Sequence, residues 1–351
     1  MSESSLQRIA IVGNGGAAIH AIMALRGAGF EGSIQQISDT EGAAFNPMLG
    51  PYFLKGMIPW ENCFPFGSDF YNDHNVECHF GSPVELIDAD NKTINICNKK
   101  KLQYDRCLVA SGASVVTPPI PGLSDLPYAF PLRTPESTLA LQGAMSSAKK
   151  VLVLGASLVG VKVAEILSKK GVEVILLDVA SQLLPRGAHP ETAKLLETHF
   201  EKHNIDIRLG CSVDGFESGE DGNCCFLFDE IIEEADFVAV CTGIRPNCSF
   251  LDPSQVRIEQ AVVVDKRMQT TAQGLYAAGD VCQGNNPLNG KNEWLGTWNN
   301  GCLQGRAAGL NMAGVATTYE GCIPQHVSPL YDWSYAQIGD VGRQGNRVRV
   351  D

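Results

Sequence analysis

Several patterns that would assign this 351-residue chain to a common functional class are missing from it. Its twelve cysteines include no Cys-x-x-Cys pair, so the tight ligand spacings of zinc ribbons and iron–sulfur clusters are absent. No apolar run approaches the roughly eighteen residues that a membrane-spanning helix needs. We therefore expect reduced, partly buried cysteines, no bound metal and no membrane span.

Basic charge is also scarce. The chain has 27 lysines and arginines against 39 acidic residues, a net charge of −12, whereas a nucleic-acid partner requires a dense basic face. No basic and apolar leader precedes the first apolar run at residues 9–12, so we expect no secretory signal and a cytoplasmic location. The length exceeds that of a single core and favours two domains with an appendage.

Glycine is abundant, and its most informative positions lie in a turn between a strand and a helix. Residues 9–12 predict the strand and residues 17–25 the helix, a context typical of a phosphate-binding fingerprint. The fingerprint consists of Gly13, Asn14, Gly15, Gly16, Ala17 and Ala18. Gly13 permits the tight turn, Gly15 lets a pyrophosphate approach the backbone, and Ala18 keeps the helix close to the strand. A glycine-rich turn without a ligand is the alternative.

A second fingerprint follows the apolar run at residues 151–154 and opens a helix predicted through residues 162–167. It consists of Gly155, Ala156, Ser157, Leu158, Val159 and Gly160. Ser157 stands where the pattern has its middle glycine, and its small side chain still allows close approach. The two fingerprints together predict two dinucleotides.

An acidic residue ends the strand that follows each fingerprint. Asp178 lies 23 residues after Gly155, the offset expected of an acid that binds ribose hydroxyls, and Asp39 lies 26 residues after Gly13, slightly more than the motif has. Residues 179–181 contain no arginine that would accept a 2′-phosphate. The sequence therefore favours NAD over its phosphorylated form.

The fingerprints and three further motifs resemble those of the pyridine nucleotide-disulfide oxidoreductase superfamily. The further motifs are residues 104–113, 241–247 and 275–281. The match covers about residues 1–325 and is similar to the branch that holds ferredoxin and rubredoxin reductases, coenzyme A-disulfide reductases and NADH oxidases. This resemblance implies an α/β fold with two Rossmann-like domains that bind FAD and NAD. An α/β domain without cofactors is the alternative.

The resemblance also implies the order of the domains along the chain. The NAD domain is inserted into the FAD domain, and a truncated interface segment follows. The expected divisions are 1–117 for the first part of the FAD domain, 118–246 for the NAD domain, 247–322 for the second part of the FAD domain and 323–351 for the interface segment. Because that segment is short, we expect either that the family's usual dimer is absent or that another protein covers the exposed face.

Nine further cofactor-binding residues are implied by the same resemblance. Asp280 would hold the ribityl chain of the flavin, although an acid in this position can equally serve as a turn or helix-capping residue. Trp298 would lie beside the isoalloxazine ring, with a simple core position as the alternative. The others are Pro47, Ala110, Ser111, Gly112, Thr242, Gly243 and Gly279.

Two positions depart from the family pattern. Met48 stands where coenzyme A-disulfide reductases and NADH oxidases have a reactive cysteine, and a thioether cannot form a thiolate or a mixed disulfide. Lys162 stands where ferredoxin reductases have a glutamate, and the lysine that pairs with that glutamate would align near Pro51. We expect that ion pair to be lost and Lys162 to act in catalysis by stabilising reduced flavin. A solvated or partner-facing lysine is the alternative.

These observations favour an FAD-dependent NADH:acceptor oxidoreductase. Residues 46–49 and 160–165 also resemble flavin subunits that link NAD to iron–sulfur subunits, so we expect a protein redox partner and a hetero-oligomer. A stand-alone NADH oxidase or nitrite-reductase-like enzyme is one alternative, and a non-catalytic flavin-binding interaction module is another. The basic ending at residues 343–349 could dock an acidic partner, or it could be a frayed tail.

Overall fold

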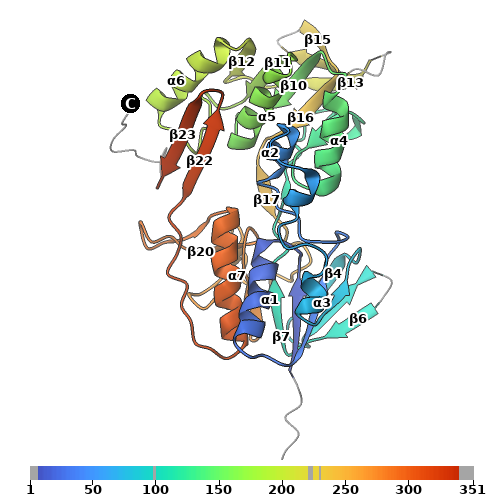
Figure 1. The fold of residues 1–351 in the computed structure, drawn as a ribbon, viewed down its shortest axis with the longest axis vertical. Coiled ribbons are helices and arrows are strands. Elements are labelled where there is room, and N and C mark those ends of the chain that lie inside the picture. Colours follow the sequence, from blue (N-terminus) through green and yellow to red (C-terminus); the bar gives the residue numbers. More distant parts are fainter. Residues whose placement is uncertain (1–6, 98–99, 220–223, 229–230, 340–351) are drawn as a thin grey trace, which may run out of the picture. The chain divides into compact units, whose positions relative to one another are not determined.

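The chain forms two compact units, which are described separately (Figure 1). The structure, a computed structural model, describes residues 7–97, 100–219, 224–228 and 231–339. The first unit consists of Met1–Asn46, Glu61–Ser114 and Pro246–Ile323, and the second of Pro47–Trp60, Val115–Arg245 and Pro324–Asp351. The basic ending at residues 343–349 lies outside the described residues.

The first unit is built on a parallel five-stranded sheet. Its order is β3 (Val76–His79), β2 (Ser33–Ile37), β1 (Arg8–Val12), β7 (Arg106–Val109) and β19 (Leu275–Ala277). All neighbouring pairs are parallel. Parallel strands are covered on both faces, which explains the uninterrupted apolar run at residues 9–12. The smaller elements of this unit are α3 (Phe70–Asp73), β4 (Val84–Asp88), β5 (Thr93–Ile96), β6 (Lys100–Gln103), β18 (Val262–Val263), β20 (Cys282–Asn285) and β21 (Asn292–Trp294).

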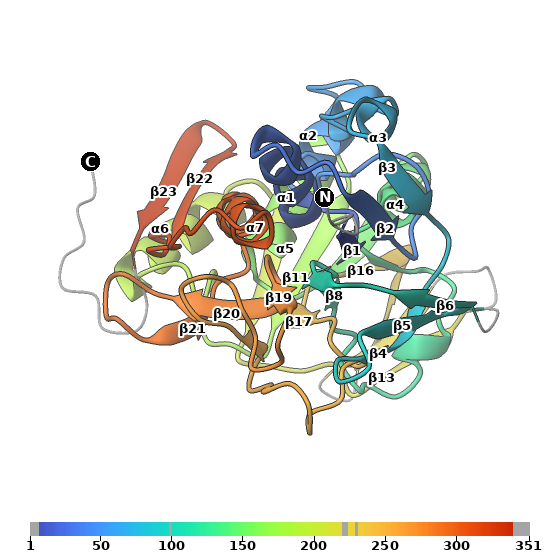
Figure 2. The same cartoon turned by 90° about the horizontal axis from the view of Figure 1, so that it is seen from below.

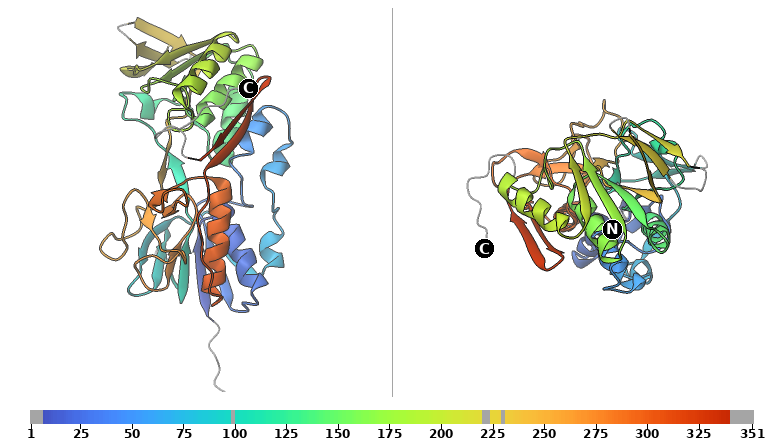
Figure 3. Two further views of the ribbon diagram at one scale, coloured as in Figure 1. Left: turned by 90° about the vertical axis from the view of Figure 1, so that its left-hand side faces the viewer. Right: turned by 90° about the horizontal axis from the view of Figure 1, so that it is seen from above.

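Two helices of the first unit pack against each other with almost no space between their backbones. Helix α1 (Gly16–Gly27) follows β1, and α7 (Trp298–Met312) lies along it (Figure 1 and Figure 3). A Cβ added at Gly305 would overlap the carbonyl oxygen of Ala17, and one added at Gly309 would meet the carbonyl oxygen of Ala21. Two glycines one turn apart therefore set the close approach of α7 to α1.

The second unit repeats the parallel arrangement. Its sheet has the order β12 (Ile205–Leu209), β11 (Glu173–Asp178), β10 (Lys150–Leu154), β16 (Phe237–Val240) and β9 (Ala129–Pro131). Its helices are α2 (Gly50–Leu54), α4 (Pro135–Met145), α5 (Leu158–Lys169) and α6 (Pro190–Glu201), with a 3₁₀ turn at Leu123–Asp125. An antiparallel layer consists of β13 (Gly215–Ser218), β14 (Cys224–Phe228) and β15 (Ile231–Ala235).

The chain passes between the units at five places: after Asn46, at a 3₁₀ turn (Trp60–Cys63), at β8 (Ala113–Val115), at β17 (Ile244–Pro246) and after Ile323. Strands β22 (Gln325–Leu330) and β23 (Trp333–Ile338) form an antiparallel hairpin beside α6, as Figure 2 shows. Three of these crossings lead into the second unit, at residues 47, 115 and 324, and two lead back to the first.

Two segments belong to the second unit although the sequence pattern assigned them elsewhere. Residues 47–60 were expected in the FAD domain, yet Leu54 packs into the core around the second sheet. The segment 323–351 was expected to form an interface, and its described hairpin inserts Leu330 and Tyr335 into that same core. In both segments apolar side chains pack into the core of the second unit. The local sequence shows that these side chains are apolar but not which core they join. An interface role for the C-terminal segment stays a prediction.

No helix in the described part of the chain is long and apolar enough to cross a membrane. The cytoplasmic location expected from the sequence stays a prediction.

The packing of α7 on α1 leads to a first prediction. We expect Gly305→Ala to lower the thermal stability of the protein, by about 1–3 kcal/mol, because the new methyl group would force the two helices apart. Gly27→Ala at the end of α1 is the matched control, since a Cβ there meets nothing within 4 Å and alanine favours a helix. Thermal unfolding of both variants measures the effect. Equal stability of the two variants would contradict this account of the packing.

Candidate functional site

The first glycine fingerprint forms a tight turn between β1 and α1. Gly13 has a φ of +112°, in the region that favours glycine, and its N–H donates to the carbonyl of Ile37 at 2.7 Å. A Cβ at this position would also overlap the carbonyl oxygen of Ala110. Gly13 is therefore required both by the turn and by the neighbouring loop.

The N-terminus of α1 is open above this turn. Gly15 is the N-cap and offers no side chain to the first-turn N–H groups, and a Cβ added there would meet no atom within 4 Å. The first N–H groups of a helix attract anions when no side chain satisfies them. Ala18 is fully buried beneath them. This open cradle fits the diphosphate of a dinucleotide.

The side chains of Asn14 and Asp39 differ in what they can offer to a cofactor. Asn14 is engaged by the protein, because its Oδ1 accepts from Gln36 Nε2 at 2.9 Å and from the Tyr71 hydroxyl at 2.7 Å. Its Nδ2 donates to the carbonyl of Gly42 at 3.0 Å. Asp39 is exposed just beyond β2, so its carboxylate is accessible for a ribose.

The second fingerprint has the same construction between β10 and α5. Gly155 has a φ of +110° and lies against the carbonyl of Cys241, and a Cβ at Gly160 would overlap the carbonyl oxygen of Gly155. Ser157, which replaces the middle glycine, caps α5: its Oγ accepts from the N–H of Gly160 at 3.3 Å and donates to the carbonyl of Cys241 at 2.8 Å. The serine therefore strengthens the turn.

The acid after the second fingerprint is held directly against it. Asp178 Oδ2 accepts from the N–H of Ala156 at 2.5 Å, and Oδ1 accepts from the N–H of Ala180 at 2.8 Å. The N–H groups of Leu158 and Val159, in the first turn of α5, donate to no acceptor among the described residues. The turn thus keeps donors for a diphosphate beside a carboxylate for a ribose.

Other expected residues of the first unit lie near its fingerprint. The ring of Trp298 lies 3.0 Å from the position of a Cβ on Gly16, and a Cβ on Gly279 would lie 3.1 Å from that of Ala17. Asp280 follows Gly279 directly. The loop of Ala110, Ser111 and Gly112 follows β7, and the carbonyl of Ala110 touches Gly13. These motifs are brought together around the turn.

In the second unit, Thr242 and Gly243 follow the carbonyl of Cys241 that packs on Gly155. The Thr242 hydroxyl donates to the carbonyl of Val116 at 2.5 Å, and Gly243 has a φ of +113°. Pro47 is half-buried, and Met48 is 42% exposed.

Lys162 is a buried cation on α5. Lys162 is only 5% exposed, and its Nζ lies 5.6 Å from the centroid of the Tyr52 ring. No ion pair or hydrogen bond to it exists among the described residues. Burial, followed by the charge of Lys55, lowers the pKa of Lys162, and Glu165 acts in the opposite direction.

An ion pair that the sequence did not predict lies one turn further along α5. Lys55 Nζ contacts Glu165 Oε2 at 2.6 Å, and the Glu165 side chain is fully buried. Glu165 also accepts from Lys169 at 2.8 Å and from the N–H of Tyr331 at 2.7 Å. Burial opposes its ionisation, yet these hydrogen bonds outweigh it and hold the pKa of Glu165 below its ordinary value.

The sequence led us to expect that the family's ion pair is lost, because Pro51 and Lys162 stand at its two positions. The structure forms a pair between residues further along both segments, Lys55 and Glu165. The sequence spacing could have pointed to Glu165 as the acidic partner, because an acid three residues after Lys162 lies on nearly the same face of a helix.

Every cysteine whose pKa shift is resolved has its pKa raised, which is the opposite of an activated thiol. None of the twelve cysteines, all of which lie among the described residues, forms a disulfide, and seven of them are buried. Burial, with a smaller effect of Glu77, raises the pKa of the exposed Cys78 to about 11, and burial raises that of Cys241 to about 12. These thiols are protonated at neutral pH, which disfavours nucleophilic chemistry at them.

Comparison with known proteins identifies the fold and its chemistry. The sequence model of the pyridine nucleotide-disulphide oxidoreductase family matches residues 7–305. The chain belongs to this family. The predictions of two Rossmann-like domains, of an oxidoreductase and of FAD and NAD as cofactors are therefore confirmed.

Individual relatives show the range of activities in the family. The chain is 32% identical over 316 residues to the epsilon subunit of the NADH-dependent phenylglyoxylate dehydrogenase of Aromatoleum evansii, which is 90% of this chain and 75% of that subunit. It is 26% identical to the putidaredoxin reductase of Pseudomonas putida, over 78% of this chain and 67% of the reductase. The fold matches a water-forming NADH oxidase from Lactobacillus brevis with a TM-score of 0.90 at 22% identity, over 95% of this chain and 76% of the oxidase.

Lys162 gives a prediction about pH. Its pKa is lowered on folding, so its buried charge costs stability at neutral pH, and this cost declines as the pH approaches the ordinary lysine pKa of about 10.4. We expect Lys162→Met to stabilise the protein at pH 7, by about 1–3 kcal/mol, and to have little effect above pH about 10.5. Urea unfolding at both pH values tests this, with the exposed Lys170→Met as control. A stabilisation independent of pH would contradict the assignment.

Proposed function

We propose that this protein is the flavin subunit of an NADH:acceptor oxidoreductase that exchanges electrons with an iron–sulfur or ferredoxin-like protein. The observation that carries the proposal is the combination of two open phosphate-binding turns with cysteines whose resolved pKa shifts are all upward. When bound, FAD supplies both hydride transfer with nicotinamide and single-electron transfer to another redox centre. Electrons that pass from NADH to the flavin must leave it for an acceptor, which in this proposal is another protein.

The relatives support a protein as that acceptor. A subunit of an NADH-dependent dehydrogenase and a reductase of putidaredoxin are both similar to this chain over most of its length. Neither name describes an enzyme that relies on a substrate disulfide. Met48 is consistent with these two, because a methionine cannot act as the reactive thiol of a disulfide or persulfide reductase.

The residues of the two turns would divide the binding of the cofactors. Gly13, Gly15 and the first turn of α1 would hold the FAD diphosphate, with Asp39 on its ribose and Asp280 on the ribityl chain. The second turn and Asp178 would hold NAD. Lys162 would act through its positive charge, which favours reduced flavin when it lies near the isoalloxazine ring.

Asp178 gives a prediction about the choice of cofactor. We expect NADH to reduce the flavin at least about tenfold faster than NADPH, because a 2′-phosphate would be repelled by the carboxylate. Asp178→Asn should reduce this preference while keeping a hydrogen-bond acceptor for Ala156. Glu173→Gln removes the same charge from the other end of β11 and should leave the preference unchanged. Stopped-flow reduction with both cofactors measures it, and equal rates in the unmodified protein would exclude this role.

The partner itself can be tested by native mass spectrometry of the assembly purified from its own cells. We expect an iron–sulfur subunit to co-purify, and NADH to reduce its clusters only when this chain is present. A chain that purifies alone and consumes oxygen or nitrite rapidly would favour the small-molecule reductase. Partner binding without reduction of the flavin by NADH would favour an interaction module. Either outcome would overturn the proposal.

A further inference from the structure

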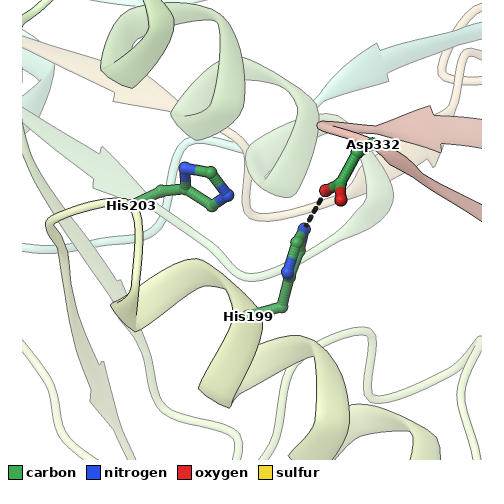
Figure 4. Close-up of side chains that lie close together, drawn as sticks. All are labelled: His199, His203 and Asp332. Carbon is green, nitrogen blue, oxygen red and sulfur yellow. Dashed lines mark ion pairs between the residues drawn. The ribbon is translucent and has the colours of Figure 1, made fainter.

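Three side chains with metal-binding chemistry converge at the end of α6 in the second unit. His199 lies in the last turn of this helix, His203 follows four residues later, and Asp332 lies in the turn of the hairpin β22–β23 (Figure 4). One potential ligand atom from each lies within 4.8 Å of the others. Residues far apart in the sequence are thus gathered at one point.

Aromatic stacking holds both imidazole rings in place. The His199 ring stacks on Trp333 with centroids 4.0 Å apart and an interplanar angle of 11°. The His203 ring stacks on Tyr331 at 3.6 Å and 4°. Both aromatic residues flank Asp332 in the hairpin turn. Stacking therefore limits the rotation of both rings while their ligand atoms lie within 4.8 Å of one another and of the Asp332 carboxylate.

The buried nitrogen of His199 has no hydrogen-bond partner among the described residues. The His199 side chain is 7% exposed, and its Nε2 lies 3.3 Å from Asp332 Oδ1 without making a hydrogen bond. A buried polar atom without a hydrogen-bond partner is uncommon in folded proteins and points to an interaction that the protein chain alone does not supply.

The unpartnered Nε2 of His199 is therefore the atom that could bind a cation. With its proton on Nδ1, a neutral imidazole presents a lone pair from Nε2, and the lone pair faces an oxygen of the Asp332 carboxylate. Two electron-rich atoms in this arrangement repel each other unless a proton or a cation lies between them. A metal ion between them would be bound by both atoms, and the buried Nε2 would then no longer lack a partner.

We propose that His199, His203 and Asp332 bind a divalent transition-metal ion, represented here by zinc, which fastens the C-terminal hairpin to the end of α6. Two imidazoles and a carboxylate are ligands that zinc accepts, whereas calcium and magnesium prefer oxygen alone. Zinc–ligand bonds of about 2.0–2.2 Å place tetrahedral ligands about 3.3–3.5 Å apart. The 3.3 Å separation between His199 and Asp332 fits this geometry. Water would take the fourth position.

This site is structural and separate from electron transfer. The hairpin contributes Leu330 and Tyr335 to the core of the second unit, and a metal at its turn would hold it there. Because a metal stabilises the folded state that binds it, the stability of this unit would depend on zinc. The expectation of no bound metal rested on cysteine spacing, which does not address a site of this composition.

The test uses the flavin-containing protein after treatment with a chelator. We expect zinc chloride to bind with one equivalent per chain in calorimetry and to raise the temperature of thermal unfolding. His203→Asn and Asp332→Asn should each weaken zinc binding at least tenfold and abolish the thermal shift. These positions are chosen because both are more exposed than His199, so the variants are expected to fold. Glu201→Gln, an exposed acid at the end of α6, is the matched control.

Two further readouts keep the result interpretable. Each variant should retain NADH-to-dye activity and a cooperative unfolding transition without zinc, which shows that it has folded. Cobalt(II) in place of zinc should give a spectrum without thiolate charge-transfer bands, because no cysteine belongs to the site. Unchanged affinity in both variants, the lack of a saturable zinc equivalent in the unmodified protein, or thiolate bands with cobalt would each overturn the proposal.

Discussion

The close approach of a carbonyl group to the first glycine of each fingerprint is the constraint on which both units depend. Gly13 lies against the carbonyl of Ala110, and Gly155 lies against that of Cys241. A side chain at either glycine would collide with backbone that cannot move without disturbing the sheet. The loop after the neighbouring strand is therefore fixed against the turn in each unit. This explains why motifs distant in the sequence, at residues 110–112 and 242–243, accompany the two fingerprints.

Glu165 has a comparable role inside the second unit. Its buried carboxylate receives hydrogen bonds from Lys55 at the C-terminal end of α2, Lys169 on α5 and the backbone of Tyr331 in the hairpin. Burying an unpaired carboxylate would be strongly unfavourable, so the three segments stabilise one another through this group. Lys162 lies in the same neighbourhood without such partners, and its charge stays uncompensated by a direct ion pair within the described residues.

The local turns could be predicted from the sequence because each depends on a few adjacent residues. Glycine at positions 13 and 155 permits a positive φ, and the apolar runs before them form buried parallel strands. The paired motifs supported FAD and NAD as cofactors, and the family match confirms both. The ion pair of Lys55 with Glu165 could not be predicted, since its partners lie 110 residues apart. The pairing depends on where α2 packs. The apolar residues of α2 do not by themselves indicate which of the two cores the helix joins.

The sequence by itself determined the two strand–turn–helix units, because backbone sterics and hydrophobic periodicity act over a few residues. Only the tertiary structure decided that residues 47–60 and the C-terminal hairpin pack with the second sheet. It also decided that His199, His203 and Asp332 meet. Such contacts join segments separated by more than a hundred residues, and their energy is gained only when the whole unit has closed around its core. No local pattern encodes that choice.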